Sequence, residues 1–145
     1  MKLSKKSEYG LRALLELTLA HGTDTVLQRH DIAARQRIPV EFLEQILLSL
    51  KRAGLLSSRR GMKGGYRLIK QPSDITLGQV IRILDGPLAP IGCVSKTAYQ
   101  KCADCPYADK PQCPVQNVMR PVRDAIADIL DHHTLADFAS DHRNV

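Results

Sequence analysis

The chain has 145 residues, of which 43% are hydrophobic and 25% charged, proportions typical of soluble globular proteins. Its length suits one ordinary domain, or a small domain with an appendage. Lysines precede apolar residues near the start, as in a signal peptide, but Arg12 and Glu16 interrupt that run. Since no other segment is long enough to span a bilayer, we expect a cytoplasmic protein without a membrane partner.

Positive charge is concentrated in the first half of the chain. The formal net charge is +6, yet residues 1–70 hold 14 Lys and Arg against 6 Asp and Glu, while residues 71–145 hold 7 against 9. A basic half of this kind suits a polyanionic partner. Considered by itself, the charge is also compatible with a solvated basic face that has no partner.

The first predicted elements, in chain order, are a helix, a short strand and a second, shorter helix that ends at a turn. Ser7 is a candidate cap for a helix over about residues 8–21, whose leucines would be mostly buried. Residues 26–28 suit a short strand, and residues 31–35 suit a two-turn helix. Proline disfavours a helical residue before it and suits the first turn of a helix. Residues 38–39, Ile-Pro, are therefore typical of a helix-turn-helix elbow.

A helix with one polar face follows this elbow and ends near Arg52, before an Ala-Gly pair. Residues 55–58 and 66–69 are then short apolar runs joined by a glycine-rich basic turn, which predicts a β-hairpin. This order is the layout of a winged helix, in which the helix enters the DNA major groove and the hairpin tip contacts the backbone or minor groove. The apolar stripe of the helix comprises Val40, Leu43, Ile46, Leu47 and Leu50.

The composition changes after the hairpin. Thr76 is a candidate cap for a helix that runs to about Leu84. Residues 87–114 then contain five prolines and all four cysteines of the chain, without a helical period. We therefore divide the chain into a DNA-binding domain at 1–86, a cysteine-containing loop at 87–114 and a dimerisation segment at 115–145.

The dimerisation segment begins with an amphipathic pattern that predicts a helix of about 17 residues. The rest of so short a chain offers no second core to cover its apolar stripe, so we expect a homodimer. Packing of the stripe onto its own domain is the alternative. Pro121 should kink or restart this helix. Thr134 and Asp137 predict a capping box that opens a last short helix.

The cysteines define the candidate metal site. In a cytosolic protein, four thiols within 21 residues are not expected to form structural disulfides. Thiolates are soft ligands that suit iron–sulfur clusters or zinc. A metal-free thiol sensor, forming a disulfide such as Cys102 to Cys105 on oxidation, is a further alternative. The ligand candidates in this loop are Cys93, Cys102, Cys105 and Cys113, separated by eight, two and seven residues.

The sequence does not predict an enzyme. Its five histidines are scattered, and no nucleophile–base or phosphate-loop spacing occurs. We therefore expect a binding protein without catalytic residues.

Several stretches of the chain resemble the Rrf-type winged-helix regulators, a family that includes iron–sulfur cluster, nitric oxide, iron and cysteine regulators. The resemblance covers nearly the whole chain. It implies a mainly α fold and a homodimeric transcription factor, which we expect to be a repressor. Many members hold an iron–sulfur cluster in the loop before the dimerisation helix. The stretches that carry the resemblance are residues 1–4, 8–11, 42–50, 75–81 and, most specifically, 54–66 with its Gly-Gly-Tyr ending.

Base-edge chemistry and the resemblance together give seven candidate contacts with double-stranded operator DNA. Gln can pair with adenine and Glu can accept from cytosine, so side chains of the second helix would read bases. Arg60 matches a wing arginine that family members place in the minor groove, where narrow A·T-rich segments concentrate negative potential. For Glu44, an ordinary surface charge is the alternative. The candidates are Glu41, Glu44 and Gln45 for bases, Arg60 for the minor groove, and Arg59, Lys63 and Arg67 for phosphates.

For the loop, the resemblance implies a [2Fe–2S] or [4Fe–4S] cluster. Cluster-binding members have three cysteines here, and Cys93 and Cys113 match the outer two. Because this chain has two middle cysteines, either all four bind one cluster or three do so with a different fourth ligand. Gln116 stands where the iron–sulfur regulator supplies a histidine.

Glu8 is the remaining ligand candidate. It matches a carboxylate that some members supply near the start of the first helix, in that case from the partner subunit. A carboxylate that simply faces the helix dipole is the alternative. Binding of a cluster would order the proline-rich loop and change the spacing of the two reading helices.

Overall fold

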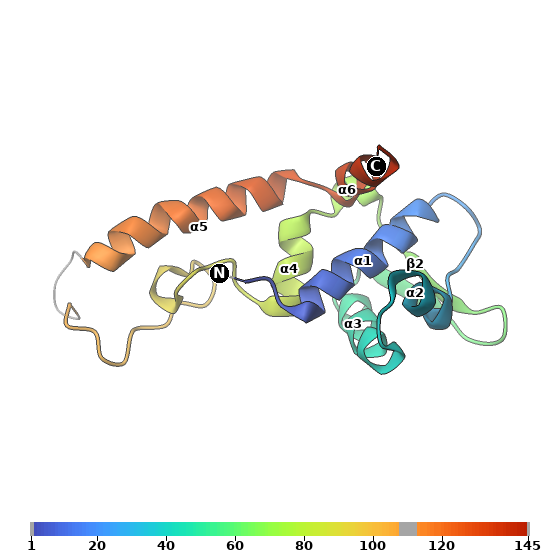
Figure 1. The fold of residues 1–145 in the computed structure, drawn as a ribbon, viewed down its shortest axis with the longest axis horizontal. Helices are drawn as coiled ribbons and strands as arrows, with labels where there is room; N and C mark the ends of the chain where they lie inside the picture. Colours follow the sequence, from blue (N-terminus) through green and yellow to red (C-terminus); the bar gives the residue numbers. More distant parts are fainter. Residues whose placement is uncertain (1, 108–112, 145) are drawn as a thin grey trace.

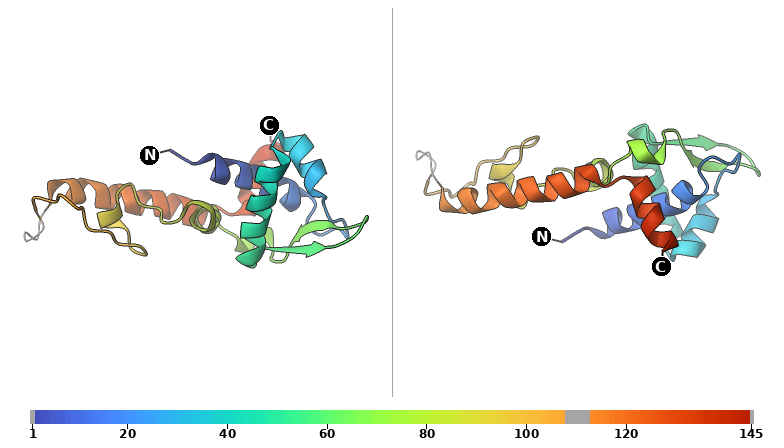
Figure 2. Two further views of the ribbon diagram at one scale, coloured as in Figure 1. Left: turned by 90° about the horizontal axis from the view of Figure 1, so that it is seen from below. Right: turned by 90° about the horizontal axis from the view of Figure 1, so that it is seen from above.

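The computed structural model describes residues 2–107 and 113–144, which form a mainly helical, elongated molecule (Figure 1). A winged-helix body carries one long helix that extends away from it, and the hairpin projects at the opposite end (Figure 2). The described elements are α1 Lys5–Leu19, α2 Arg29–Gln36, α3 Val40–Arg52, β1 Leu56–Arg59, β2 Gly65–Leu68, η1 Pro72–Asp74, α4 Leu77–Asp85, η2 Gly92–Val94, α5 Pro114–His132 and α6 Leu135–Arg143.

The first helix starts earlier than the sequence suggested. Ser4 is the N-cap, and its Oγ accepts a hydrogen bond from the backbone N–H of Ser7 at 3.1 Å. Ser7 itself is fully buried inside α1, so the prediction that Ser7 caps the helix is wrong. Ser4 can cap because its backbone is extended and lies three residues before the N–H that needs an acceptor. The helix ends at Leu19 and not at His21.

The core lies where α1, α2, α3 and α4 meet. Leu43, Ile46, Leu47 and Leu50 face it from α3 with fully buried side chains, as their spacing predicts. Burying one such side chain contributes about 1.5–3 kcal/mol, and replacing it with alanine costs about 2–5 kcal/mol. This packing fixes α3 so that its opposite face remains exposed.

The hairpin is a two-stranded antiparallel sheet in which Ser57 pairs with Arg67 and Ser58 with Tyr66. The strand expected at residues 26–28 is reduced to an isolated bridge, because only Leu27 pairs with Tyr66, through hydrogen bonds of 3.0 and 2.8 Å. Gly65 permits this approach, since a Cβ there would lie 2.5 Å from the carbonyl oxygen of Leu27. The bridge ties the hairpin to the segment before α2.

The predicted caps of the last two short helices are present. Thr76 Oγ1 accepts from the N–H of Gln79 at 3.1 Å and opens α4. Thr134 and Asp137 form the capping box of α6. Although α6 follows the long helix, it returns to the body and packs on α1, with Leu135 fully buried in the core.

The long helix α5 runs unbroken from Pro114 to His132, so the prediction that Pro121 restarts it is wrong. Figure 1 shows α5 as one gently curved ribbon without a sharp bend at its middle. Proline removes the hydrogen bond to the carbonyl of Asn117. Because Asn117 and Pro121 are both exposed, water can hydrate that carbonyl and the helix continues. Within the ranges 2–107 and 113–144, none of the helices combines the length and apolar character needed to cross a membrane.

Candidate nucleic-acid interface and cysteine cavity

A groove of about 860 Å³ lies between the start of α2, α3 and the hairpin. Its walls carry four cationic side chains, those of Arg29, Lys51, Arg59 and Arg60, and the carboxylate of Glu44. Lys51 Nζ donates to Ser58 Oγ at 2.6 Å, so one hydrogen bond joins α3 to the first hairpin strand. Cations around a groove beside an exposed helix face favour a polyanionic partner.

Glu44 is paired inside this groove. Arg29 Nη1 lies 2.8 Å from Glu44 Oε1, and both side chains are partly exposed. Glu41 and Gln45 are also exposed on α3, so the three predicted base-reading residues share its outer surface. Arg29 was not among the sequence candidates, because it is 15 residues from Glu44 and the two meet only when α2 and α3 pack together.

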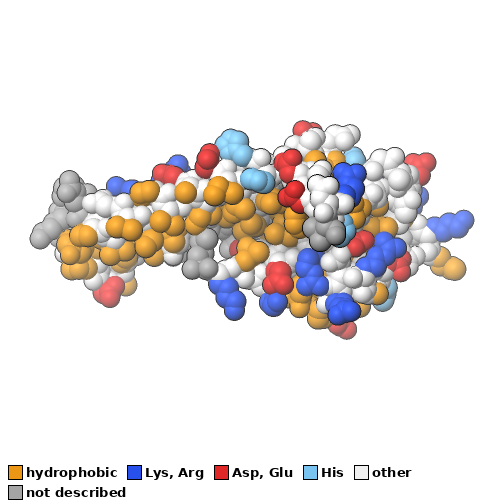
Figure 3. Space-filling view, turned by 45° about the horizontal axis from the view of Figure 1, so that its top comes forward, with side chains coloured by type: hydrophobic (Ala, Val, Ile, Leu, Met, Phe, Trp, Pro, Cys, Tyr) orange, Lys and Arg blue, Asp and Glu red, His pale blue; other side chains and the backbone are white. Residues whose placement is uncertain are grey.

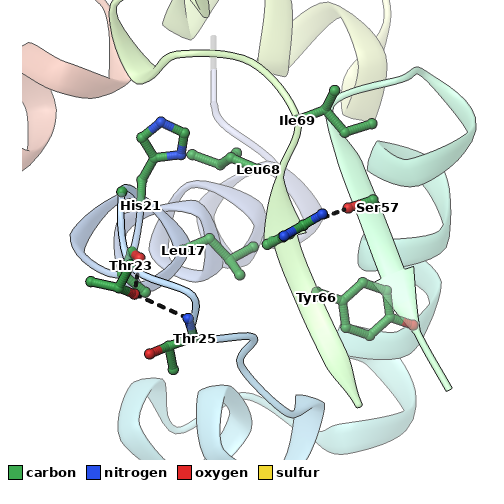
Figure 4. A pocket seen from close by; sticks show the side chains of 11 residues that line it. Leu17, His21, Thr23, Thr25, Ser57, Tyr66, Leu68 and Ile69 are labelled. Atoms are coloured by element: carbon green, nitrogen blue, oxygen red, sulfur yellow. Dashed lines mark hydrogen bonds between the residues drawn. The ribbon is translucent and has the colours of Figure 1, made fainter.

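The hairpin separates its predicted DNA contacts. Arg59, Arg60 and Lys63 are exposed at or near the tip, on the end that projects from the body. Arg67 lies on the other side of the sheet, where its Nε is 3.4 Å from Ser57 Oγ. That side faces a second cavity of about 410 Å³, in which Figure 4 shows Leu17, Ser57 and Leu68. Arg67 therefore does not line the groove.

All four cysteines line one cavity of about 370 Å³ between the loop and the start of α5. Cys93 is buried within η2, Cys102 is exposed, and Cys105 and Cys113 are half-buried. The Sγ atoms of Cys93 and Cys102 are 3.9 Å apart. Cys113 is the N-cap of α5, so its side chain lies at the amino end of the long helix.

The close contact between these two thiols affects the ionisation of Cys102. The hydrogen bond with Cys93, and next the charge of that same group, raise the pKa of Cys102 above its ordinary value. Lys101, Arg120 and Arg123 also line the cavity and would offset the negative charge of several thiolates. The cavity therefore combines soft donors with cationic surroundings.

The shared cavity does not bring the thiols to a single point. Among the residues that the structure describes, no group of three or more His, Cys, Asp or Glu side chains is placed to hold a metal ion. One zinc ion needs its ligands about 2.3 Å from a common centre. An iron–sulfur cluster takes its thiolates on different iron atoms, so its ligands are spread more widely. The four thiols are soft donors of the kind that iron–sulfur clusters and zinc both take.

Two side chains of α5 hold the loop that carries Cys93. Gln116 Nε2 donates to the carbonyl oxygen of Cys93 at 3.2 Å, and Arg123 Nη1 donates to that of Val94 at 2.5 Å. The amide of Gln116 therefore binds backbone, and its Oε1 accepts from Arg120 at 2.9 Å. These contacts attach the buried end of the cavity to the long helix.

Glu8 lies in the first turn of α1 and does not line the cysteine cavity of its own chain. Its carboxylate is 2.9 Å from Lys5 Nζ and 3.8 Å from Arg12 Nη1. The hydrogen bond with Lys5 lowers the pKa of Glu8 below its ordinary value. Within one chain, this carboxylate is a surface charge near a helix start.

The outer face of α5 is apolar and uncovered by the described residues of its own chain. Val118 and Ile129 are 61% and 59% exposed, and none of the residues of α5 is buried. Figure 3 shows this apolar face as an orange stripe along the extended half of the molecule. Pairing with another apolar surface would remove this stripe from water.

A helix-turn-helix followed by a basic hairpin, with an exposed reading face on α3, defines a winged-helix DNA-binding protein. The sequence model described as Rrf2, iron-dependent transcriptional regulator, matches residues 3–141. The chain belongs to the Rrf2 family of transcriptional regulators. This confirms the family, the winged-helix fold and the expectation that the chain is not an enzyme.

Individual relatives are similar over almost their full length. An rrf2-like HTH-type regulator of Rhodobacter capsulatus is 40% identical over 137 residues, which are 93% of this chain and 90% of that protein. The structure of CymR, the global cysteine regulator of Bacillus subtilis, matches with a TM-score of 0.75 and 34% identity and covers 97% of each chain. That of T. potens IscR gives a TM-score of 0.75 at 31% identity and covers 98% of this chain and 88% of that one.

Proposed function

We propose that the chain is a homodimeric, cytoplasmic repressor that binds operator DNA and responds to an iron–sulfur cluster held by its loop cysteines. The ligands are Cys93, Cys102, Cys105 and Cys113. The observation that carries this proposal is their convergence on one cavity of about 370 Å³, although they are spread over 21 residues of the chain. A bound cluster supplies sensitivity to iron supply, oxygen or nitric oxide.

Cys102 is the preferred fourth ligand. Its Sγ is already 3.9 Å from that of Cys93, whereas the Gln116 amide is engaged by the Cys93 carbonyl and by Arg120. Glu8 is paired with Lys5 on the winged-helix body. Fewer existing contacts must therefore break if Cys102 is the fourth ligand than if Gln116 or Glu8 is.

Coupling between the cavity and DNA runs through α5. Gln116 and Arg123 attach the loop to this helix, and Arg82 on α4 binds Asp131 near its far end with bonds of 2.6 and 2.9 Å. If two chains pair along their α5 stripes, a change in loop order shifts α5 relative to its partner. The spacing of the two α3 helices then changes with it.

DNA reading is assigned to the two sides of the groove. Glu41, Glu44 and Gln45 on α3 face base edges in the major groove, and Arg60 enters the minor groove at the wing. Arg59 and Lys63 contact phosphates, since both lie exposed near the hairpin tip. Arg67 faces the opposite side of the hairpin from the groove, so the phosphate contact expected for it from the sequence is not part of this proposal.

The proposal is tested by comparing cluster-loaded and cluster-free protein on DNA. Duplexes are selected from a random-sequence pool with each form, and binding is measured anaerobically by fluorescence anisotropy. We expect the two forms to differ by about tenfold or more on at least one selected duplex, which corresponds to about 1.4 kcal/mol of coupling. Tyr99→Phe, which changes a non-thiol residue of the cavity, should keep the difference. Equal affinity of the two forms on every selected duplex would contradict the switch.

A metal-free thiol switch is the second candidate, favoured by the contact between Cys93 and Cys102. Oxidation by hydrogen peroxide would join these two sulfur atoms, with two electrons and two protons passing to the hydrogen peroxide to give two water molecules. The preferred disulfide is therefore Cys93–Cys102, in place of the Cys102–Cys105 bond suggested by the sequence. Peptide mapping after peroxide treatment of metal-free protein would identify the bond.

A further inference from the structure

The tip of the hairpin is a tight turn that displays one apolar side chain. The N–H of Gly64 donates to the carbonyl oxygen of Gly61 at 3.0 Å and closes the turn around Met62 and Lys63. Gly61 has a φ of 101°, which favours glycine, and a Cβ on Gly64 would lie 2.1 Å from the carbonyl oxygen of Arg59. The conformation of the tip is therefore fixed by its two glycines.

The position of the tip is fixed as well. Gln28 Nε2, at the N-cap of α2, donates to the carbonyl oxygen of Met62 at 2.8 Å. The backbone bridge between Leu27 and Tyr66 lies just behind it. Because the same helix start also borders the DNA-binding groove, the tip stands in a defined place beside α3. It extends beyond the body at the end opposite α5 (Figure 2).

Met62 is 95% exposed, the largest exposure of any large hydrophobic residue that the structure describes. Its neighbours Arg60 and Lys63 are cationic, and the sequence has no acidic residue from 45 to 73. Basic neighbours bring the tip to a polyanion, whereas a thioether chain gains nothing from phosphates. The apolar faces of stacked bases offer a surface against which this side chain can be buried.

We propose that Met62 enters the operator minor groove as a wedge between two base pairs and bends the duplex. The inference rests on the proposed DNA-reading function and adds a residue, a contact and a deformation to it. Arg60 lies along the groove floor, Lys63 holds a phosphate, and the methionine partly unstacks one step. Apolar wedges of this kind kink DNA toward the major groove by about 20–90°. Pyrimidine–purine steps unstack most easily, so the wedge selects such a step at a position that α3 does not touch.

The experiment uses full-length protein, in the form that binds more tightly, on an end-labelled duplex taken from the random pool. End-to-end energy transfer reports the bend, and anisotropy reports the affinity. Met62→Leu keeps an apolar side chain and should keep both. Met62→Ala should lose most of the bend and bind about tenfold more weakly, which corresponds to about 1.4 kcal/mol of lost apolar contact.

Met62→Lys separates the wedge from simple charge attraction. It adds a phosphate contact, so it should retain affinity within about threefold while the bend is lost. Replacing the pyrimidine–purine step opposite the wing by a stiff A-tract should weaken the wild type and leave Met62→Ala unaffected. An unchanged bend in Met62→Ala, or loss of the bend in Met62→Leu, would overturn the wedge while leaving DNA recognition intact. Failure of the wild type to select any duplex would instead overturn the proposed function.

Discussion

The side-chain amide of Gln116 donates a hydrogen bond to the carbonyl oxygen of Cys93 at 3.2 Å. This bond joins the first cysteine of the loop to the first turn of α5, across 23 residues of sequence. Because Arg123 binds the next carbonyl, that of Val94, two points on one helix hold the same backbone turn. The state of the cysteine loop and the position of the long helix are therefore physically linked.

The first prediction concerns this link. Gln116→Leu has a similar size but cannot donate, so the turn around Cys93 should open more often. We expect amide hydrogen exchange in residues 92–95 to accelerate about two- to tenfold, which corresponds to about 0.5–1.5 kcal/mol for one hydrogen bond. Asn117→Leu is the matched control, since Asn117 is exposed on the adjacent position of α5. Unchanged exchange in Gln116→Leu would show that the bond does not stabilise the loop.

The second prediction concerns base reading by Glu44. Arg29 competes for the carboxylate that a cytosine amino group would use, because the two side chains already lie 2.8 Å apart. Glu44→Gln should therefore abolish a cytosine preference of about 1–3 kcal/mol at one operator position. Arg29→Met should strengthen that preference, although phosphate contacts are weakened overall.

Affinity measurements on four duplexes, one for each base at that position, check this prediction. Arg35→Met is a suitable control, because Arg35 pairs with Glu16 on the body and does not line the groove. If Arg29→Met left the base preference as it was, the ion pair would have no part in discrimination.

The third prediction concerns the wing. Arg60→Ala should cost about 1–3 kcal/mol of binding free energy. It should also reduce the slope of log affinity against log salt concentration by about one. Arg67→Ala removes the same charge from the other side of the hairpin, so its effect should be much smaller. The measurement is a salt titration of operator affinity for both variants. Equal losses in the two variants would mean that the groove side of the hairpin is not the DNA-binding side.

The fourth prediction concerns the dimer. Val118→Asp places a charge on the apolar stripe, where Val118 is 61% exposed in one chain. A charge buried without a partner is costly, so the variant should sediment as a monomer at concentrations where the wild type is dimeric. Asn117→Asp, on the polar side of the helix, should remain a dimer. Sedimentation velocity distinguishes the two, and a monomeric wild type would contradict the assignment of α5.

The fifth prediction concerns acid stability. Asp131 receives two hydrogen bonds from Arg82, and this contact lowers the pKa of Asp131 below its ordinary value. A carboxyl with a depressed folded-state pKa stabilises the fold above the unfolded-state pKa of about 3.9, and this stabilisation is lost as the pH falls through the folded-state value. The melting temperature of the wild type should therefore fall more steeply below about pH 4 than that of Asp131→Asn. Asp128→Asn, at an exposed site, should retain the wild-type slope.

Local signals predicted the parts of the fold that depend on a few neighbouring residues. The apolar stripe of α3, the Thr76 cap and the Thr134 capping box all follow from spacings of three or four residues, and the structure contains them. Ser4 and Ser7 show the limit of such signals, since both precede the same apolar pattern and only burial decides between them.

Other features depend on contacts between distant segments. Gln28 forms a hydrogen bond with the backbone of the hairpin tip, 34 residues later in the chain, and no sequence motif predicts this contact. The face on which Arg67 lies follows from strand register, which the apolar runs alone left open by one residue. The four cysteines were identified from their type and spacing. The contact between the Cys93 and Cys102 thiols, in contrast, follows from the path of the loop.

The iron, sulfide and zinc content of protein purified without oxygen tests the cluster assignment most directly. The assignment predicts a coloured protein with equal amounts of iron and acid-labile sulfide, lost when Cys93, Cys102, Cys105 or Cys113 is replaced by alanine and retained in Gln116→Ala and Glu8→Gln. A colourless protein with one zinc ion per chain, or with no metal at all, would contradict it.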